Sequence, residues 1–325
     1  MTGTARETLL EIDDLTVRLA SGAARPVLDG VALRVARGES VGLVGESGSG
    51  KSVTSRAALG LLPAGATATG TVRVAGDDVL TMSAARLREL RRREVAMVFQ
   101  DPRASINPVR RIGDFVTEGL RAGGTPARAA RATAEELLEA VGITDPRRAL
   151  RRFPHEFSGG MLQRVMIAGA LAGGPRLLLA DEPTTALDVT TQAEVIAILT
   201  RLQAERGTGL LFVTHDLDLA AAVCDRIYVM YAGRIVEEQT AEGLFARPRH
   251  PYTAGLLAAT PRMGSGEPPR GVPGRPVSLA ENPEGCAFAA RCRLAAPECA
   301  AERPALRLVD GVSVACHRAE EPIHD

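Results

Sequence analysis

The sequence contains the stretch Gly45-Glu46-Ser47-Gly48-Ser49-Gly50-Lys51-Ser52, which matches the pattern G-x-x-x-x-G-K-[ST] at every position. The apolar run Ser40 to Val44 predicts a strand directly before this loop, and Ser52 to Leu62 predicts a helix directly after it. Glycines in such a loop let backbone N–H groups surround phosphates, the lysine reaches the β and γ phosphates, and the serine ligates Mg²⁺. The stretch therefore predicts a nucleoside triphosphate site, in which we include the next helix residue, Val53.

Lys51 is the only lysine of the chain, although lysine and arginine together number 39. Every other cationic side chain apart from histidine is therefore an arginine. An ammonium is compact and strongly hydrated, whereas a guanidinium is broad and planar, so the two are not interchangeable at a tight site. The single retained lysine indicates that position 51 requires an ammonium.

A pair of carboxylates follows a second apolar run. Leu177 to Ala180 predicts a buried strand, and Asp181 and Glu182 come directly after it. An acidic pair after a strand is often only a solvated turn. Because a phosphate loop lies upstream, the functional interpretation is favoured: a buried Asp181 holds the Mg²⁺ shell and Glu182 is the base for an attacking water.

The order of predicted elements indicates an α/β fold. Short alternating runs from Leu9 to Gly45 predict strands joined by turns. Further strands are predicted near residues 71–80, 176–180 and 210–214, and helices over 84–93, 126–141 and about 190–205. After His250 proline and glycine become frequent, which places a domain boundary near Pro248.

Composition narrows the possible partners. The 39 basic and 39 acidic residues cancel, and aromatic residues make up only 3% of the chain, so neither a basic surface nor stacking platforms for nucleic acid are expected. The first residues lack a secretory apolar stretch, and no apolar run has the length of a membrane span. We expect a cytoplasmic protein that does not bind nucleic acid and that reaches a membrane only through a partner.

Four further motifs carry a resemblance to a known family. The stretch Phe157-Ser158-Gly159-Gly160-Met161 resembles the signature motif of ABC ATPases, about twenty residues before Asp181 as in that family. Gln100 resembles its Q-loop, Ala186-Leu187-Asp188 its D-loop, and His215 its switch histidine. The resemblance implies a P-loop NTPase nucleotide-binding domain with a RecA-like core, an N-terminal antiparallel β part and a helical subdomain over about 101–165.

The same resemblance implies a role for each motif. Two such domains would pair head to tail, and each ATP would lie between the phosphate loop of one and the signature residues Ser158, Gly159 and Gly160 of the other. Glu182 would be the general base, His215 and Lys51 would bind the γ-phosphate, and Asp188 would lie near the shared site. The implied magnesium residues are Ser52, Gln100 and Asp181. The sequence departs from the family at Leu19, where an aromatic residue often stacks on adenine, so the adenine contact stays open.

Longer strings resemble the ATPases of oligopeptide/dipeptide (and nickel) importers: Gln100 to Pro108, Phe153 to Met161, and His250-Pro251-Tyr252-Thr253. The resemblance implies an ATPase domain over 7–248 and a C-terminal extension of the importer type over 249–325. It also implies two membrane permease subunits, a second and different ATPase subunit, an extracytoplasmic substrate-binding protein, and a place on the cytoplasmic face of the membrane. Import of nickel or another small solute is the alternative within the family.

The extension contains four of the five cysteines, namely Cys286, Cys292, Cys299 and Cys316. They fall where that importer family carries a cysteine motif associated with an iron–sulfur cluster, so the resemblance implies a [4Fe–4S] cluster. Their spacing does not match the paired C-x-x-C pattern of structural zinc sites. Zinc and four free packed thiols stay open as alternatives, and the lone Cys224 is expected to be a buried apolar residue.

Two other classes of protein compete with a transporter subunit. A soluble ABC ATPase that acts on DNA or ribosomes would usually contain two cassettes, a long coiled-coil insertion or a basic surface, and the sequence has none of these. An inactive regulatory subunit would not be expected to keep Lys51, Asp181, Glu182 and His215 together. Both alternatives are therefore disfavoured.

Overall fold

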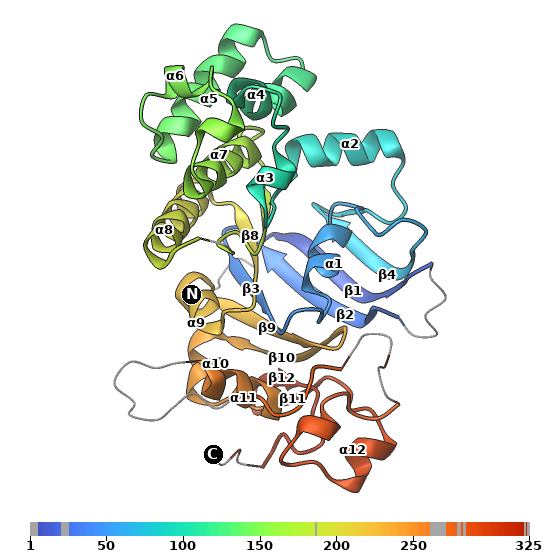
Figure 1. Cartoon of the computed structure of the whole chain (residues 1–325). Helices are drawn as coiled ribbons and strands as arrows, with labels where there is room; N and C mark the ends of the chain where they lie inside the picture. The colour runs from blue at the N-terminus through green and yellow to red at the C-terminus, as the bar shows by residue number, and fades with distance from the viewer. Residues whose placement is uncertain are drawn as a thin grey trace, which may run out of the picture.

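A computed structural model describes residues 6–20, 26–185, 187–260, 271–277, 281, 284–321 and 323. Two β-sheets form the middle of the molecule, a group of helices lies at one end, and the C-terminal part lies at the other (Figure 1). The first sheet is antiparallel, with strand order β2-β1-β4-β5. Its strands are β1 (Thr8–Arg18), β2 (Leu28–Ala36), β4 (Thr67–Val74) and β5 (Asp77–Asp78).

The second sheet has eight strands in the order β11-β12-β10-β9-β3-β8-β7-β6. Its strands are β3 (Ser40–Val44), β6 (Val95–Val98), β7 (Leu177–Asp181), β8 (Gly209–Thr214), β9 (Arg226–Tyr231), β10 (Arg234–Thr240), β11 (Arg307–Val309) and β12 (Val312–Val314). The five neighbouring strands β9, β3, β8, β7 and β6 are parallel to one another, and the remaining pairs are antiparallel. Strand, helix and strand therefore alternate as the sequence predicts.

The parallel strands are mostly apolar because both faces of the sheet are covered. In β8, Leu210 and Phe212 belong to the core shared with helices of the helical group, whereas Leu211 and Val213 belong to the core shared with the antiparallel sheet. Every residue of β3, β7 and β8 is buried. Continuous apolar runs such as Leu177 to Ala180 follow from this arrangement.

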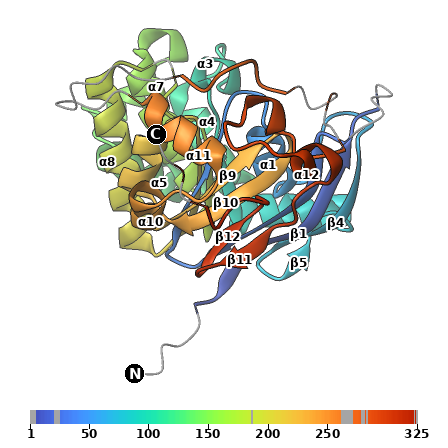
Figure 2. The same ribbon diagram turned by 90° about the horizontal axis from the view of Figure 1, so that it is seen from below.

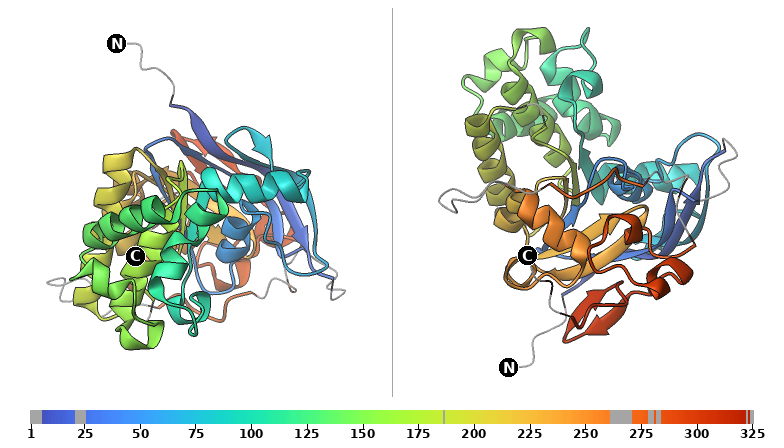
Figure 3. Two further views of the ribbon diagram at one scale, coloured as in Figure 1. Left: turned by 90° about the horizontal axis from the view of Figure 1, so that it is seen from above. Right: turned by 60° about the horizontal axis from the view of Figure 1, so that its bottom comes forward.

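Helices surround the large sheet and form the group at one end (Figure 3, left). They are α1 (Lys51–Ala57), α2 (Ala84–Arg93), α3 (Pro102–Ser105), α4 (Ile112–Ala122), α5 (Ala127–Ala140), α6 (Pro146–Ala149), α7 (Gly159–Leu171), α8 (Val189–Arg206), α9 (Leu217–Val223), α10 (Ala241–Ala246), α11 (Pro251–Ala259) and α12 (Pro297–Ala301). Two 3₁₀ turns are η1 (Pro154–Glu156) and η3 (Ala289–Arg291). The elements α3 to α6 lie in the range predicted for a helical subdomain.

One predicted helix is shorter in the structure. The sequence predicts a helix to Leu62, but α1 ends at Ala57. Gly60 has a φ of +63° and its N–H donates to the carbonyl of Ala57. A glycine in this left-handed conformation is a common helix stop, and Pro63 follows it.

The C-terminal extension is built onto the large sheet (Figure 2; Figure 3, right). Strand β12 pairs with β10, with Glu237 opposite Val314 and Glu238 opposite Ser313. The predicted boundary near Pro248 stays a prediction, but the parts on its two sides share one sheet. The extension is therefore continuous with the sheet whose other strands carry the predicted phosphate loop.

His250 joins the extension to the core and is 1% exposed. Its Nδ1 accepts a hydrogen bond from the N–H of Tyr252 at 3.0 Å and caps α11, and its own N–H donates to Glu237 Oε2 at 2.9 Å. Burial lowers the pKa of His250 from 6.5 to about 3. The folded protein therefore keeps this imidazole neutral at pH values where the unfolded chain binds a proton.

Acidification from pH 7 to pH 5 is expected to lower the stability of the protein through His250. The unfolded chain takes up a proton below pH 6.5 and the folded protein does not until about pH 3, so His250 alone lowers the free energy of unfolding by about 2 kcal/mol at pH 5. The His250→Asn variant keeps a capping acceptor without this titration. Urea unfolding of both proteins at pH 7 and pH 5 measures the change in the free energy of unfolding. The buried Glu237 contributes equally to this change in the two proteins. Identical pH dependence in the two proteins would contradict the assignment.

Candidate functional site

The predicted phosphate loop connects β3 to α1. Gly45 packs directly against β9, and a Cβ at this position would lie 2.2 Å from the carbonyl oxygen of Met230. Gly50 precedes the helix with a φ of +109°, in the region that favours glycine. The two glycines therefore allow the loop to turn sharply and to start α1 with its free N–H groups directed outward.

Lys51 lies inside the loop and its side chain is 4% exposed. Its Nζ donates to the carbonyl oxygen of Gly45 at 2.7 Å and to that of Glu46 at 3.0 Å, and it lies 4.0 Å from Glu182 Oε1. Burial lowers the pKa of Lys51, and the charges of Glu182, Asp181 and Glu46 act in the opposite direction. The loop thus orients the ammonium toward the carboxylates at the end of β7.

Ser52 and Asp181 are in direct contact. Ser52 Oγ donates to Asp181 Oδ1 at 2.8 Å, and Asp181 is 1% exposed. The other carboxylate oxygen, Oδ2, is buried without a hydrogen-bond partner and lies 3.5 Å from Arg56 Nη2. Burial raises the pKa of Asp181. A hydroxyl beside a carboxylate with one unsatisfied buried oxygen fits a Mg²⁺ site, because Mg²⁺ takes hard oxygen ligands and is usually held by one or two carboxylates.

Glu182 has a strained backbone and a well-defined side chain. Its φ is +48°, which is uncommon for a residue other than glycine, and its N–H donates to the carbonyl of Val213. Glu182 Oε2 accepts hydrogen bonds from Gln100 Nε2 at 2.9 Å and from Thr185 Oγ1 at 3.0 Å, and His215 Nδ1 lies 3.5 Å from it. The carboxylate is therefore held from several sides at the carboxyl end of β7.

The strand order explains why these distant residues meet. Strands β3, β8 and β7 are parallel neighbours, with Val44 opposite Thr214 and Asp181 opposite Val213. The residues that follow them therefore leave the sheet at the same edge, where ligands bind in open α/β sheets. The structure brings together Lys51, Ser52, Gln100, Asp181, Glu182 and His215, as the sequence motifs predict.

The predicted signature residues lie on other elements. Ser158 Oγ accepts from the N–H of Met161 at 3.3 Å and caps α7, and Asp188 caps α8 by accepting from the N–H of Thr191 at 3.0 Å. Gly160 packs on Thr191, and a Cβ at Gly160 would lie 2.3 Å from the Thr191 methyl group. In Figure 1 helices α7 and α8 lie apart from α1. Ser158, Gly159, Gly160 and Asp188 therefore form a second group, separate from the phosphate loop.

Two residues of the site were not predicted. Thr185 donates to Glu182, and Arg56 approaches Asp181. Arg56 follows Ser52 by four residues on one helix, so the two share a helix face. This spacing could have indicated that Arg56 belongs to the site. Thr185 follows Glu182 by three residues in a loop and carried no recognisable signal.

The C-terminal cysteines do not support a cluster. Among the residues that the structure describes, no group of three or more histidine, cysteine, aspartate or glutamate side chains is placed to hold a metal ion. All four thiols are free, and burial raises the pKa of Cys286, of Cys292 and, to about 12, of Cys316. As arranged, the thiols fit neither the predicted [4Fe–4S] cluster nor the zinc alternative. Cys224 is buried in the apolar core, as expected.

None of the helices in the described ranges is both long enough and apolar enough to span a membrane.

Comparison with known sequences identifies relatives along the whole chain. The pattern of the ABC transporter family matches residues 28–185, and that of the oligopeptide/dipeptide transporter C-terminal region matches residues 236–299. The chain is 44% identical to a probable peptide ABC transporter ATP-binding protein of Sinorhizobium fredii, over 98% of this chain and 97% of the relative. It is 46% identical to the oligopeptide transport ATP-binding protein OppD of Bacillus subtilis, over 87% of this chain and 81% of that protein.

Solved structures confirm the predicted fold of the nucleotide-binding domain. The ATP-binding cassette MJ0796, in a dimeric post-hydrolysis state with ADP and phosphate, matches with a TM-score of 0.63 at 28% identity, over 72% of this chain and 99% of that chain. The protein cbiO1 of Clostridium perfringens, part of an ABC transporter complex, matches with a TM-score of 0.65 at 27% identity, over 74% and 91% of the two chains. The chain therefore belongs to the ABC transporter ATPases, within the family of ATP-binding subunits of oligopeptide and dipeptide transporters.

Proposed function

We propose that this chain is the ATP-hydrolysing motor subunit of an importer for di- or oligopeptides. The observation that carries the catalytic part is the position of Glu182. Its carboxylate accepts hydrogen bonds from Gln100 and Thr185 and lies close to both Lys51 and His215, at the edge where the phosphate loop begins α1. A fixed carboxylate beside a phosphate site has the placement that a base for water requires.

Each residue of the site has a role in this proposal. The N–H groups of residues 45–53 and the Lys51 ammonium bind the β and γ phosphates of ATP, while Ser52 and Asp181 hold Mg²⁺. Mg²⁺ bound there offsets the negative charge of the phosphates. Glu182 accepts the proton of the attacking water, and His215 binds the γ-phosphate.

Gln100 serves this site through Glu182. In the structure its amide nitrogen donates to Glu182 Oε2, so it orients the base. Its predicted contact with Mg²⁺ stays a prediction.

The complete ATP site is proposed to need two ATPase chains. The residues Ser158, Gly159, Gly160 and Asp188 lie at the starts of α7 and α8, and Ser158 leads into a helix whose first N–H groups can bind an anion. We infer that this group completes the site on a second ATPase subunit. The dimeric MJ0796 cassette, which the chain resembles, supports this inference.

The transport part of the proposal rests on the relatives. Those named above are a peptide ABC transporter ATP-binding protein and an oligopeptide transport ATP-binding protein, and the match to the transporter-specific C-terminal region supports the same cargo class. We propose two permease subunits, a second and related ATPase chain and an extracytoplasmic binding protein as partners, with this chain on the cytoplasmic face of the membrane. Nickel or another small solute is the alternative cargo.

Reconstitution of the co-purified importer in vesicles tests this function. Phosphate release is expected to rise when the binding protein is loaded with a di- or oligopeptide, and labelled peptide is expected to accumulate across the membrane only with ATP. The same assay with the Lys51→Ala variant should show neither effect. Stimulation by Ni²⁺ in place of peptides would establish the alternative cargo, and stimulation by DNA without permeases would overturn the transport function.

A further inference from the structure

The C-terminal extension contacts the phosphate loop directly. Arg291 of η3 forms a two-pronged ion pair with Glu46, the second residue of the loop, with Nη1 at 2.7 Å from Oε2 and Nη2 at 2.9 Å from Oε1. The Arg291 side chain is only 4% exposed. Buried charge-assisted pairs of this geometry are among the stronger and more directional contacts in proteins.

Arg291 is itself fixed from several sides. Its Nε donates to the carbonyl of Pro273 at 2.7 Å, and Nη1 donates to the hydroxyl of Tyr231 at 3.3 Å. The guanidinium carbon also lies 5.7 Å from the ring centroids of both Tyr231 and Phe288. The guanidinium is therefore preorganised to meet Glu46 rather than recruited from a mobile surface side chain.

A second contact holds the backbone of the same loop residue. The N–H of Glu46 donates to the hydroxyl of Tyr252 at 2.8 Å, and Tyr252, in α11, is fully buried. Its ring packs on Tyr231 at a centroid distance of 4.6 Å and on Phe288 at 5.4 Å. Both the side chain and the backbone of Glu46 are thus anchored by residues after Pro248.

The position of Glu46 matters for the residue that binds phosphate. The carbonyl oxygen of Glu46 accepts a hydrogen bond from Lys51 Nζ at 3.0 Å, next to that of Gly45 at 2.7 Å. A carboxylate in this loop would also repel the polyphosphate that the loop has to bind, unless a cation compensates its charge. Arg291 provides that cation from the side of the loop that faces the extension.

We propose that Arg291 is a positioning residue for ATP binding, which acts through Glu46 to hold the phosphate loop and to neutralise its carboxylate. The inference rests on the proposed ATP site at Lys51. It makes the C-terminal extension part of the nucleotide site rather than an independent appendage. ATP affinity should then depend on Arg291 more than the rate of hydrolysis by the loaded site does, because Arg291 contacts the phosphate loop through Glu46, whereas Gln100 and Thr185 hold Glu182.

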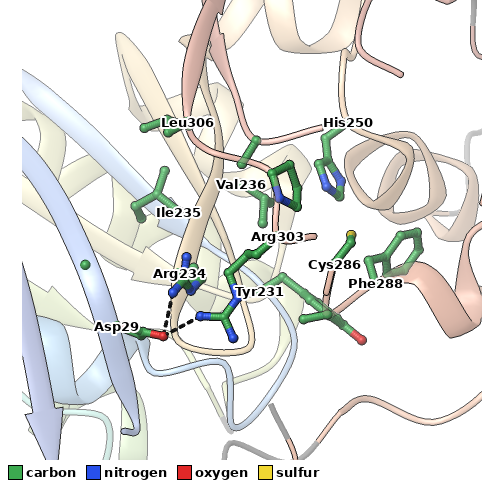
Figure 4. Close-up of a pocket in the computed structure, with 14 residues that line it drawn as sticks. Asp29, Tyr231, Arg234, Ile235, Val236, His250, Cys286, Phe288, Arg303 and Leu306 are labelled. Atoms are coloured by element: carbon green, nitrogen blue, oxygen red, sulfur yellow. Dashed lines mark hydrogen bonds and ion pairs between the residues drawn. The ribbon is translucent and has the colours of Figure 1, made fainter. Parts of the chain in front are cut away.

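The extension contains a second arginine–carboxylate pair, which serves as a control for the attachment of the extension to the core. Arg303 Nη1 binds Asp29 Oδ2 at 2.7 Å, and Arg234 Nη2 binds the same oxygen at 2.5 Å, beside a cavity of about 110 Å³ (Figure 4). Arg303 therefore also anchors the extension to the core through an arginine–carboxylate pair, but its pair does not involve Glu46. A variant at Arg303 loosens the extension without leaving Glu46 unpaired.

The test compares four variants of the full chain: Arg291→Ala, Arg291→Lys, Arg303→Ala and the double variant Arg291→Ala/Glu46→Gln. Arg291→Ala is expected to raise the Kd of a fluorescent ATP analogue and the KM for ATP by about tenfold or more, with a much smaller change in kcat. Arg303→Ala should change neither constant. The double variant should recover part of the affinity, because the uncompensated carboxylate is gone although the loop is no longer held by the ion pair, and mere loosening of the extension does not predict this recovery.

A second readout uses the single lysine of the chain. Protein labelled with ¹⁵N-lysine and carrying a lysine-free tag gives one backbone amide resonance, from Lys51. Arg291→Ala is expected to shift or broaden it, and Arg303→Ala should leave it in place. The shift reports the conformation of the phosphate loop independently of enzymatic activity.

The outcomes separate the possible failures. Unchanged ATP affinity and an unchanged Lys51 resonance in folded Arg291→Ala protein would overturn the positioning role alone. If Arg291→Ala does not fold, Arg291→Lys is the deciding variant, because it keeps the charge but not the two-pronged geometry. It should also weaken ATP binding. Unchanged ATP binding in Arg291→Lys would overturn the positioning role. Undiminished ATP binding by Lys51→Ala would instead overturn the proposed ATP site and this inference with it.

Discussion

Replacement of Glu182 by glutamine is expected to leave ATP binding intact and to lower ATP turnover by about 10²- to 10⁴-fold. The carboxamide has the shape of the carboxylate and can still accept a hydrogen bond from Gln100 or Thr185, so the loop after β7 should keep its conformation. It cannot, however, accept the proton of the attacking water. The expected effect therefore falls on kcat and not on the Kd for ATP.

Phosphate release and binding of a fluorescent ATP analogue measure the two quantities separately. A suitable control is Glu205→Gln, because Glu205 is half exposed near the end of α8 and forms an ion pair only one helical turn away, with Arg201. Its replacement should leave both quantities unchanged. Undiminished phosphate release in Glu182→Gln would show that another group is the base.

The backbone at Glu182 gives this prediction a structural control. A φ of +48° is costly for a residue with a side chain and persists only where the surroundings enforce it. Here the N–H of Glu182 is bound to Val213 and the carboxylate to Gln100 and Thr185. Glutamine keeps the same backbone requirement, so a loss of turnover in Glu182→Gln cannot be ascribed to a different strain at this position.

The sequence could predict the part of the site that its motifs and the ends of its predicted strands carry. The runs Ser40 to Val44, Leu177 to Ala180 and Leu210 to Thr214 become adjacent parallel strands, and parallel strands end at one edge. Residues that follow such runs therefore converge, which is the physical reason why Lys51, Asp181 and His215, placed together by the motifs and the resemblance to ABC ATPases, lie at one edge. The predicted end of the first helix was wrong because Gly60, with its positive φ, ended α1 before the apolar residues Leu61 and Leu62.

Contacts made by tertiary packing alone could not be predicted. Arg291 and Glu46 are 245 positions apart, and an arginine among so many carries no local sign of its partner. The four cysteines show the opposite case. The family resemblance implied a metal cluster, whereas the structure shows four free thiols, buried or half-buried, and no group among the described residues that is placed to hold a metal ion. Side-chain packing decides both cases, and the order of residues does not encode it locally.

Replacement of Lys51 by arginine is expected to weaken ATP binding by about a hundredfold or more, although the charge is kept. The Lys51 ammonium lies between two carbonyl oxygens at 2.7 and 3.0 Å in a loop where its side chain is 4% exposed. A planar guanidinium is broader, and it cannot occupy this space without displacing the loop that binds the phosphates. The converse exchange Arg73→Lys, at a half-exposed ion pair with Glu11, is expected to have no effect on binding.

The single lysine also allows a direct measurement on the unaltered protein. An amine-reactive reagent can modify only Lys51 and the N-terminus, so mass spectrometry reports the accessibility of one side chain. Mg²⁺ and ATP are expected to protect Lys51 from modification, because the ammonium then binds the β and γ phosphates. If ATP protects Lys51 in the unaltered protein but the Lys51→Arg variant binds ATP as well as before, the loop requires a cation but not an ammonium. In that case the retention of one lysine among so many arginines would need a cause other than phosphate binding.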